Sequence, residues 1–259
     1  MKKSSDERGT KNMKRKFFQS KFDIRIYECD IKGRLHPLSL FNFMQELAST
    51  HADRLGFSVQ QLMQKQMTWV LSRLHLKILK KVYWKENIIG RTWPSERVGK
   101  YALRDFEFYN EKKELIATAT SSWMVIDLEK RRPLKLDDLF TSDFIRQQRA
   151  LPDDFPPLPQ VTHNQYEKEF MVGFTDLDMN RHVNHVRYIV WALESLPEEI
   201  LFKYFPMEVE VSYRKEVFLG DHIISKIQPW QEEQNILYYQ QLFLKKSGEE
   251  IARLRTRWM

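Results

Sequence analysis

The chain has 259 residues, of which 42% are hydrophobic and 13% aromatic, and its 42 Lys and Arg against 35 Asp and Glu give a formal net charge of +7. This apolar content excludes wholesale disorder, and no segment approaches the ~18 consecutive apolar residues that a membrane span needs. The single cysteine, Cys29, excludes an internal disulfide and a cysteine-based zinc site, so we expect an intracellular, cytoplasmic protein.

The first 19 residues are predicted to form a disordered, basic tail. Residues 1–16 contain seven Lys or Arg and two acidic residues, a local charge of +5, which leaves only +2 for the rest of the chain. The tail lacks the apolar run of a secretory signal. Because the excess charge lies in the tail and no nucleic-acid motif follows it, we expect no nucleic-acid partner.

A long amphipathic helix is the first predicted element of the folded part. Its apolar positions recur at spacings of three and four and are Leu40, Met44, Leu47, His51 and Leu55. Gly56 is suited to end this helix, and His51 is expected to be a hydrogen-bonded core residue. Two strands, Ala102–Tyr109 and Leu115–Ile126, then form a predicted hairpin.

A proline-rich stretch, Leu151–Pro159, separates the first half from the second. We therefore predict an N-terminal domain at residues 20–140, a linker at 141–164 and a C-terminal domain at 165–259. The second half repeats the order of elements, with a helix that Pro197 ends, then strands. The residues that indicate these elements are Val183, Val186, Val190 and Leu193 for the helix, Val209, Val211 and Tyr213 for a half-buried strand, and Tyr238–Leu244 with Glu250–Trp258 for a hairpin.

Residue identities recur between the two halves at two offsets. Asp30 and Glu46 recur as Asp178 and Glu194 at an offset of 148, and Ile116 and Trp123 recur as Ile251 and Trp258 at an offset of 135. Such a repeat indicates duplication of one structural unit. A helix followed by an antiparallel sheet, present twice, predicts an α+β tandem hot-dog fold, in which each half is a curved antiparallel sheet wrapped around a long central helix.

The densest polar cluster is the segment DLDMNRHVNHVRY, residues 176–188, at the start of the second helix. Its first side chains match the opening ligands of an EF-hand calcium loop, but Arg181 and Arg187 replace the glycine and the bidentate glutamate of that loop, so calcium is excluded. His182 and His185, three residues apart, could converge on a transition metal, although no third ligand is evident.

The same segment is suited to hydrolysis. Asn180 offers an amide N–H donor near a helix N-terminus, where it could stabilise an oxyanion. His182 can accept or release a proton at neutral pH, and Asp178 could orient a neighbouring group. Simple capping of the helix by these side chains is the structural alternative.

Other nucleophiles are missing from the sequence. No G-x-S-x-G elbow and no glycine-rich phosphate loop are present, and Cys29 is interpreted as a packed thiol. Attack would then come from an activated water or from a carboxylate that forms a transient anhydride.

The segment DLDMNRHVNHVRYIVWALES closely resembles the helix-start motif of the acyl-acyl carrier protein (acyl-ACP) thioesterases, plant and bacterial enzymes that release free fatty acids. Similarity extends over most of residues 20–259 and includes MTWVLSRLHLKILKKVYWKENI, LRDFEFYN, IATATSSWMVIDLEKRRP and VEVSYRKEV. The resemblance implies a bacterial-type double hot dog that hydrolyses fatty acyl-ACP in fatty acid biosynthesis, without a cofactor or a metal.

By the same resemblance, Asp178, Asn180, His182 and Glu216 form the catalytic set. Asn180 and His182 would position and polarise the thioester or the attacking water, Asp178 would support them, and Glu216 would act as base or nucleophile. Many plant members carry a cysteine directly after this glutamate, whereas this chain has Val217, which excludes a thiol nucleophile there. From the residues alone, Glu216 reads as a solvated carboxylate on the polar face of a strand.

The first half lacks this set, because Lys32 and Arg34 stand where the second half has Asn180 and His182. Its helix is expected instead to border an acyl tunnel, with plain core packing as the alternative. The residues predicted to bind the acyl chain are Leu40, Met44, Leu47, Ala48 and Trp69.

The implied partner is an acidic acyl carrier protein, which a basic surface would attract. The predicted docking residues are Lys130, Arg131, Arg132, Arg253, Arg255 and Arg257, for which a solvated surface is the alternative. Two other functions stay open: an acyl-coenzyme A thioesterase and a non-catalytic acyl-binding hot-dog protein. The chain is predicted to be a monomer or a homodimer.

Overall fold

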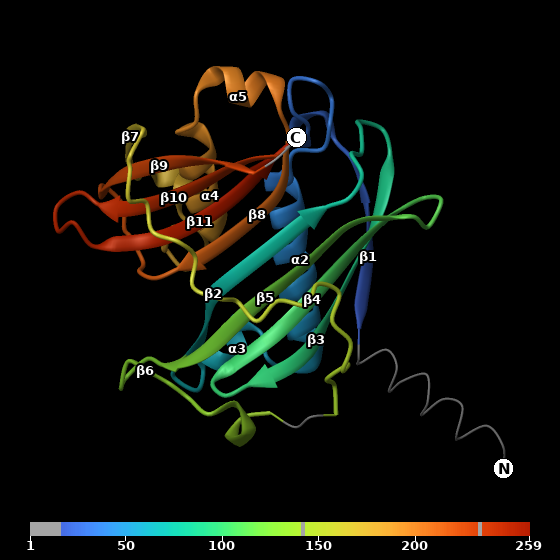
Figure 1. Ribbon diagram of the computed structural model, residues 1–259. Coiled ribbons are helices and arrows are strands. Elements are labelled where there is room, and N and C mark those ends of the chain that lie inside the picture. Colours follow the sequence, from blue (N-terminus) through green and yellow to red (C-terminus); the bar gives the residue numbers. More distant parts are fainter. Residues whose placement is uncertain (1–16, 141–142, 233–234) are drawn as a thin grey trace, which may run out of the picture. The chain divides into compact units, whose positions relative to one another are not determined.

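The computed structural model describes residues 17–140, 143–232 and 235–259 and divides the chain into two compact units (Figure 1). Unit 1 comprises Met1–Ser72 and Ile78–Asp153, and unit 2 comprises Arg73–Lys77 and Asp154–Met259. The change of unit after Asp153 falls inside the predicted linker. Residues 1–16 of the predicted tail lie outside the described ranges, and the first strand begins at Phe18, two residues before the predicted domain boundary.

Unit 1 is an antiparallel sheet with one long helix against it. Its elements are β1 (Phe18–Asp23), the 3-10 helix η1 (Ile26–Glu28), α2 (Pro37–Leu55), α3 (Val59–Met63), β2 (Met67–Ile78), β3 (Asn87–Val98), β4 (Tyr101–Asn110), β5 (Leu115–Asp127), β6 (Arg132–Pro133) and η2 (Leu136–Asp138). The strand order is β1-β3-β4-β5-β2, and β1–β3, β3–β4 and β4–β5 are antiparallel pairs. The predicted hairpin is confirmed as β4 and β5, and α2 runs along one face of the sheet (Figure 1).

The helix α2 ends where the sequence predicts. His36 Nδ1 accepts a hydrogen bond from the backbone N–H of Leu38 (3.1 Å) at its start, where Pro37 occupies the first turn. Gly56 ends it in the left-handed conformation, with φ of 85°. The predicted apolar face is buried from Leu40 to His51, so the periodicity in the sequence identified the side of the helix that faces the sheet.

Two contacts fix α2 on the sheet. A β-carbon at Gly90 of β3 would lie only 2.7 Å from Leu47 Cδ1 and 2.9 Å from Phe108 Cε1, so a glycine is needed for this close approach. Nearer the helix end, His51 Nδ1 lies 3.2 Å from a guanidinium nitrogen of Arg104 on β4. The expectation that His51 is a hydrogen-bonded core residue is confirmed.

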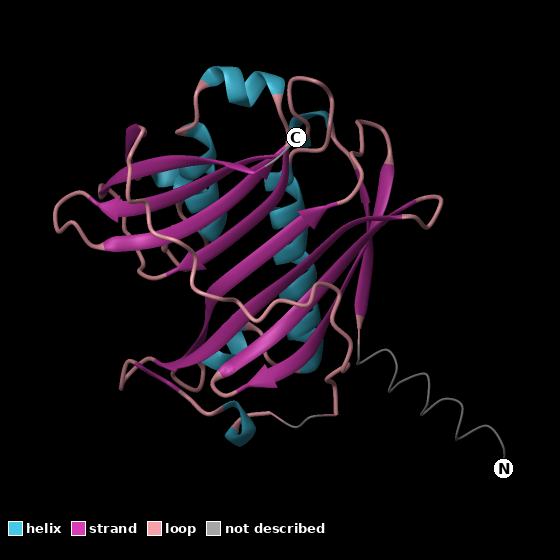
Figure 2. Ribbon diagram, in the orientation of Figure 1, coloured by secondary structure: helices cyan, strands magenta, loops and turns pink. Residues whose placement is uncertain are grey.

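Unit 2 has the same construction. Its elements are β7 (Tyr166–Met171), the 3-10 helix η3 (Phe174–Asp176), α4 (His185–Glu194), α5 (Glu198–Lys203), β8 (Pro206–Tyr213), β9 (His222–Glu232), β10 (Asn235–Leu244) and β11 (Glu250–Trp258). Residues 73–77 of β2 pair antiparallel with β8, and the order continues β8-β11-β10-β9-β7. The helix α4 contacts β10 and β11. The second predicted hairpin is confirmed as β10 and β11, and strands dominate both units (Figure 2), as in the predicted double hot dog.

The polar side of β8 is buried, against the sequence-based expectation of a solvated face. The register places Glu208 opposite Arg257 and Glu210 opposite Arg255, so each carboxylate faces an arginine on the neighbouring strand. His75 Nε2 also lies 2.9 Å from a carboxylate oxygen of Glu208. Alternation along one strand could not reveal these partners, because they belong to other strands.

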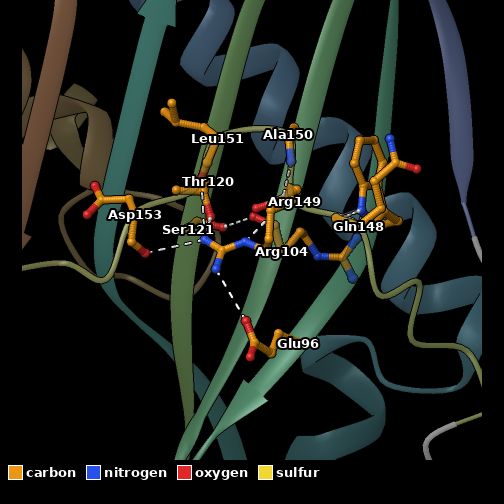
Figure 3. A network of polar contacts seen from close by, with 11 residues as sticks. Glu96, Arg104, Thr120, Ser121, Gln148, Arg149, Ala150, Leu151 and Asp153 are labelled. Atoms are coloured by element: carbon orange, nitrogen blue, oxygen red, sulfur yellow. Dashed lines mark hydrogen bonds and ion pairs between the residues drawn. The ribbon is translucent and has the colours of Figure 1, made fainter.

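The first part of the linker is held on unit 1 by Arg149 (Figure 3). Its guanidinium donates to the buried Asp105 carboxylate (3.1 Å), to Thr120 Oγ1 (3.1 Å) and to two linker carbonyls, and it pairs with Glu96 at 3.3 Å. The same Asp105 oxygen accepts a hydrogen bond from the backbone N–H of Ala150 (2.8 Å). We call these contacts the linker clasp. They attach the start of the linker to β4 and β5.

No helix within the described ranges is long and apolar enough to cross a membrane.

Candidate active site

The segment predicted to carry the chemistry forms a tight turn in front of α4. An isolated bridge between Leu177 and Val183 closes the turn, and the backbone N–H of Asp178 donates to the carbonyl of His182 (2.8 Å). Arg181 adopts the left-handed conformation near the tip, with φ of 61°. The side chains of Asn180 and His182 are exposed on this turn.

Asp178 shapes the turn through its carboxylate. One carboxylate oxygen accepts hydrogen bonds from the backbone N–H groups of Asn180 (2.7 Å) and His182 (3.3 Å). Both contacts order the backbone that carries the two exposed side chains. The supporting role predicted for Asp178 therefore has a geometric basis, which acts through the backbone.

The helix α4 begins later than expected. Asn184 is its N-cap and accepts a hydrogen bond from the backbone N–H of Val186 (2.9 Å), so capping is performed by a residue that the sequence argument did not select. Asn180 lies on the turn before the helix. Asn180 is therefore near the helix N-terminus, as expected, but four residues before the N-cap, so an oxyanion contact would come from its side-chain amide or from the turn itself.

His182 and Glu216 come together from separate segments. His182 Nδ1 lies 3.5 Å from Glu216 Oε1, and the two side chains are 46% and 53% exposed. The prediction that Glu216 lies on a strand is wrong, because β8 ends at Tyr213 and Glu216 belongs to the loop that leads to β9. The hydroxyl of Tyr188, on α4, donates to the carbonyl of Lys215 (3.2 Å) and so anchors this loop next to the turn.

This arrangement is suited to proton transfer. An imidazole next to a carboxylate can share a proton, and both groups are accessible from solvent. Asn180 supplies an amide on the same turn as His182. Three of the four predicted catalytic residues therefore lie on one turn, and the structure brings the fourth, Glu216, to His182.

Two further contacts at the site were missed by the sequence analysis. The ring of Phe218 meets the His182 ring edge-on, with 6.1 Å between centroids. Arg187 Nε lies 2.6 Å from a carboxylate oxygen of the buried Asp176, which fixes the start of the turn against α4. The sequence held no signal for Phe218, because its role depends on where the loop after β8 lies.

His185 differs from His182 in its environment, because its side chain is partly buried and that of His182 is exposed. Burial lowers its pKa to about 4, and its carbonyl accepts a hydrogen bond from the hydroxyl of Tyr213 (3.2 Å). Among the described residues, His182 and His185 do not form a metal-binding group with a third His, Cys, Asp or Glu.

The first repeat contains the same turn with different side chains. A carboxylate oxygen of Asp30 accepts hydrogen bonds from the backbone N–H groups of Lys32 and Arg34 (both 2.9 Å), and Cys29 bridges Leu35 as Leu177 bridges Val183. The buried Arg34 side chain pairs with Asp30 at 2.7 Å. The duplicated turn thus carries an internal ion pair in unit 1 and an exposed histidine in unit 2.

The residues predicted to bind the acyl chain fall into two groups. Leu40, Met44, Leu47 and Ala48 are buried together on α2. Trp69 belongs to another cluster, where it stacks on Phe140 with 5.4 Å between ring centroids and donates a hydrogen bond to the carbonyl of Phe57 (2.8 Å).

The predicted docking residues also divide. Lys130 and Arg131 are exposed on the turn between β5 and β6, and the exposed Arg132 is the first residue of β6. Arg253, Arg255 and Arg257 do not form a row of cations without acidic partners. Arg253 is buried and pairs with Glu250 (2.7 Å), while Arg255 and Arg257 pair with the buried glutamates of β8 at 3.0–3.5 Å. The prediction of a basic docking surface is therefore wrong for these arginines, because carboxylates already match their charges.

Known proteins resemble this chain along nearly its whole length. A relative from Arabidopsis thaliana, oleoyl-acyl carrier protein thioesterase 2, is 28% identical over 284 aligned residues, which cover 93% of this chain and 76% of the relative. An acyl-ACP thioesterase structure from Bacteroides thetaiotaomicron is 25% identical, with a TM-score of 0.80 and coverage of 94% of this chain and 98% of that one. The 12:0-ACP thioesterase of Umbellularia californica has a TM-score of 0.85 at 24% identity, with 94% of each chain covered, which shows the shared fold.

Family models cover both halves of the chain. The model of the acyl-ACP thioesterase N-terminal domain matches residues 15–144, and that of the C-terminal domain matches residues 160–259. The chain spans 60–76% of the length of eight plant relatives. With both domain models matched in order and the double hot-dog fold in place, the chain belongs to the acyl-ACP thioesterase family.

Proposed function

We propose that this protein hydrolyses the thioester of fatty acyl-ACP and releases a free fatty acid. The observation that carries the proposal is the contact between His182 and Glu216, 3.5 Å apart, beside the turn that bears Asn180. Family membership supports the choice of substrate. A cytoplasmic location, which the unpaired Cys29 favours, belongs to the same proposal.

Each residue has a distinct part in the proposed reaction. Glu216, with His182, removes a proton from water, and the water oxygen attacks the thioester carbonyl carbon. The Asn180 amide stabilises the negative charge that develops on the carbonyl oxygen. The carbon–sulfur bond then breaks, the fatty acid keeps the water oxygen, and the carrier's sulfur receives a proton. Asp178 holds the turn in position through its backbone contacts.

The acyl chain and the carrier are assigned to different surfaces. The buried face of α2, from Leu40 to Ala48, is proposed to border the acyl chain, and Trp69 to border it from the neighbouring cluster. Lys130, Arg131 and Arg132 are proposed to attract the acidic carrier protein, because they are three consecutive exposed cations.

The decisive test measures free fatty acid released from acyl-ACP by the purified full chain. Wild type should release it, and H182A and N180A should each lower kcat at least ~100-fold. H163A, which removes an exposed histidine from the linker, is the matched control and should keep the wild-type rate. Failure of wild type to release fatty acid would disprove the function, and equal rates for wild type and H182A would disprove the site.

The same assay separates the two thiol carriers. One acyl chain should be offered on the carrier protein and on coenzyme A, with kcat/KM measured for both. The proposal expects the higher kcat/KM with the carrier protein. Replacing Lys130 and Arg131 by glutamine should raise KM for acyl-ACP without changing kcat.

A further inference from the structure

Unit 1 presents large apolar side chains to solvent around the duplicated turn. We call this surface the aromatic patch; its members are 46–74% exposed and are Ile26, Tyr27, Ile31, Tyr83 and Trp84. Monomeric soluble proteins rarely leave so many large apolar groups together in water unless the surface binds something.

Backbone contacts make the aromatic patch one surface. Its members lie on two segments, one around η1 and the duplicated turn, the other just before β3. Arg34 forms an isolated bridge with Tyr83, and the backbone N–H of Trp84 donates to the carbonyl of Gly33 (3.0 Å). The two segments are therefore held side by side, with Trp84 next to the turn that carries Ile31.

Two of the aromatic rings of the patch contact a cation. Lys85 Nζ lies 4.4 Å from the centre of the Trp84 ring, and an Arg25 guanidinium nitrogen donates to the hydroxyl of Tyr27 (2.6 Å). Lys32 is exposed on the duplicated turn. Aromatic rings with a polar edge, beside Lys and Arg, suit a surface that is apolar on one side and anionic on the other.

The carboxylates of the same segments bind the protein itself. Glu28 accepts a hydrogen bond from the backbone N–H of Arg25 (2.8 Å), and Glu86 accepts one from the backbone N–H of Tyr83 (2.9 Å). Asp30 is paired with Arg34. Glu28 and Asp30 are half-buried as a result, whereas Glu86, like the lysines and the rings, is exposed.

We propose that the aromatic patch binds the surface of an anionic lipid bilayer. Trp and Tyr favour the level of the lipid headgroups, isoleucine favours the acyl boundary, and Lys and Arg are attracted by anionic lipids. The patch stands on the repeat that lacks the catalytic set and contains none of the residues assigned to the proposed hydrolysis. The inference therefore holds or fails independently of the proposed function.

Vesicle sedimentation with the full chain tests the proposal. The probes are vesicles of phosphatidylcholine alone and of phosphatidylcholine with phosphatidylglycerol. Wild type should bind the anionic vesicles, and the double variant Y83S/W84S should lose about ten-fold or more in partitioning. I31S should weaken binding in the same direction. K85Q should weaken binding to anionic vesicles and leave the weak binding to neutral vesicles unchanged.

The matched control is W230S, which removes an exposed tryptophan from β9 of unit 2 and should bind as wild type does. The basic residues of 1–16 are present in every variant, so their attraction to anionic lipid is the same throughout. Thermal unfolding of each variant checks that it is folded; if the double variant is not, I31S and K85Q decide the question.

Three results would overturn the proposal. One is equal vesicle binding by wild type, Y83S/W84S and I31S. A second is a dimer, measured by light scattering, that these variants dissociate while vesicle binding is absent, which would assign the patch to a second copy of the chain. A third is a raised KM for acyl-ACP in the variants with unchanged vesicle binding, which would assign the patch to the carrier protein.

Discussion

His182 Nδ1 lies 3.5 Å from Glu216 Oε1, and this contact joins the turn before α4 to the loop after β8. Both sides of the contact depend on α4. The turn leads directly into the helix, where Arg187 pairs with Asp176, and the loop is bound by the hydroxyl of Tyr188. One helix therefore positions both members of the pair, so the site's geometry follows from how α4 packs on its sheet.

Loss of the Glu216 charge should stop the reaction without unfolding the protein. In E216Q the side chain keeps its size but can no longer accept a proton, so kcat should fall ~100-fold or more. The measurement is fatty acid release under saturating acyl-ACP. E199Q, at an exposed glutamate on α5, is the control and should retain wild-type kcat. Wild-type turnover by E216Q would remove Glu216 from the mechanism.

Phe218 should influence catalysis through the orientation of the His182 ring. F218L loses the edge-on ring contact and should lower kcat about 2- to 10-fold, while F218Y should keep it. KM should change little, because the contact is made to the catalytic group. The neighbouring L219A serves as control for a smaller side chain on the same loop. If F218L and F218Y lower kcat equally, the ring contact is irrelevant.

The half-buried His185, whose imidazole is desolvated, should make stability depend on pH in a defined window. The pKa of His185 in the folded state is about 4, below the ordinary 6.5. Between these two pH values the imidazole is protonated in the unfolded chain and neutral in the folded chain. This contribution to the free energy of unfolding is complete above pH 6.5. It should fall by at most about 3 kcal/mol as the pH decreases toward 4.

Urea unfolding of wild type and H185F, measured between about pH 7.5 and about pH 4, tests this window. H185F keeps an aromatic ring beside Tyr213 and should show a smaller loss of stability on acidification. H163F, at an exposed histidine, should follow the wild-type slope. Parallel curves for wild type and H185F would contradict the prediction.

The linker clasp should contribute several kcal/mol to the free energy of unfolding of unit 1. R149M leaves the buried Asp105 carboxylate without its cation and should reduce the free energy of unfolding by about 3 kcal/mol. R149M/D105L should regain part of that loss, because no unpaired charge remains buried. As control, K21M breaks an exposed ion pair with Asp23 and should cost less than ~1 kcal/mol. Equal stability losses in R149M and K21M would show that the clasp is not a stabilising unit.

Features that depend on one element or on local chain geometry were predictable from the sequence. The buried face of α2 and its end at Gly56 follow from apolar spacing and from the need for a left-handed residue. The repeat at an offset of 148 corresponds to two copies of one turn, each held by an aspartate that accepts backbone hydrogen bonds, Asp30 and Asp178. Side-chain periodicity and turn chemistry depend on only a few neighbouring residues, so they can be predicted from a single sequence.

Features that join distant segments were decided only by the tertiary structure. Glu216 meets His182 because the loop after β8 is anchored to α4. Arg255 and Arg257 form ion pairs because the strand register sets them opposite Glu210 and Glu208. Trp84 reaches the duplicated turn through a backbone hydrogen bond to Gly33. Strand pairing and helix packing determine which segments meet. Their energy is spread over many weak contacts between segments far apart in the chain, so no local pattern in the sequence encodes the outcome.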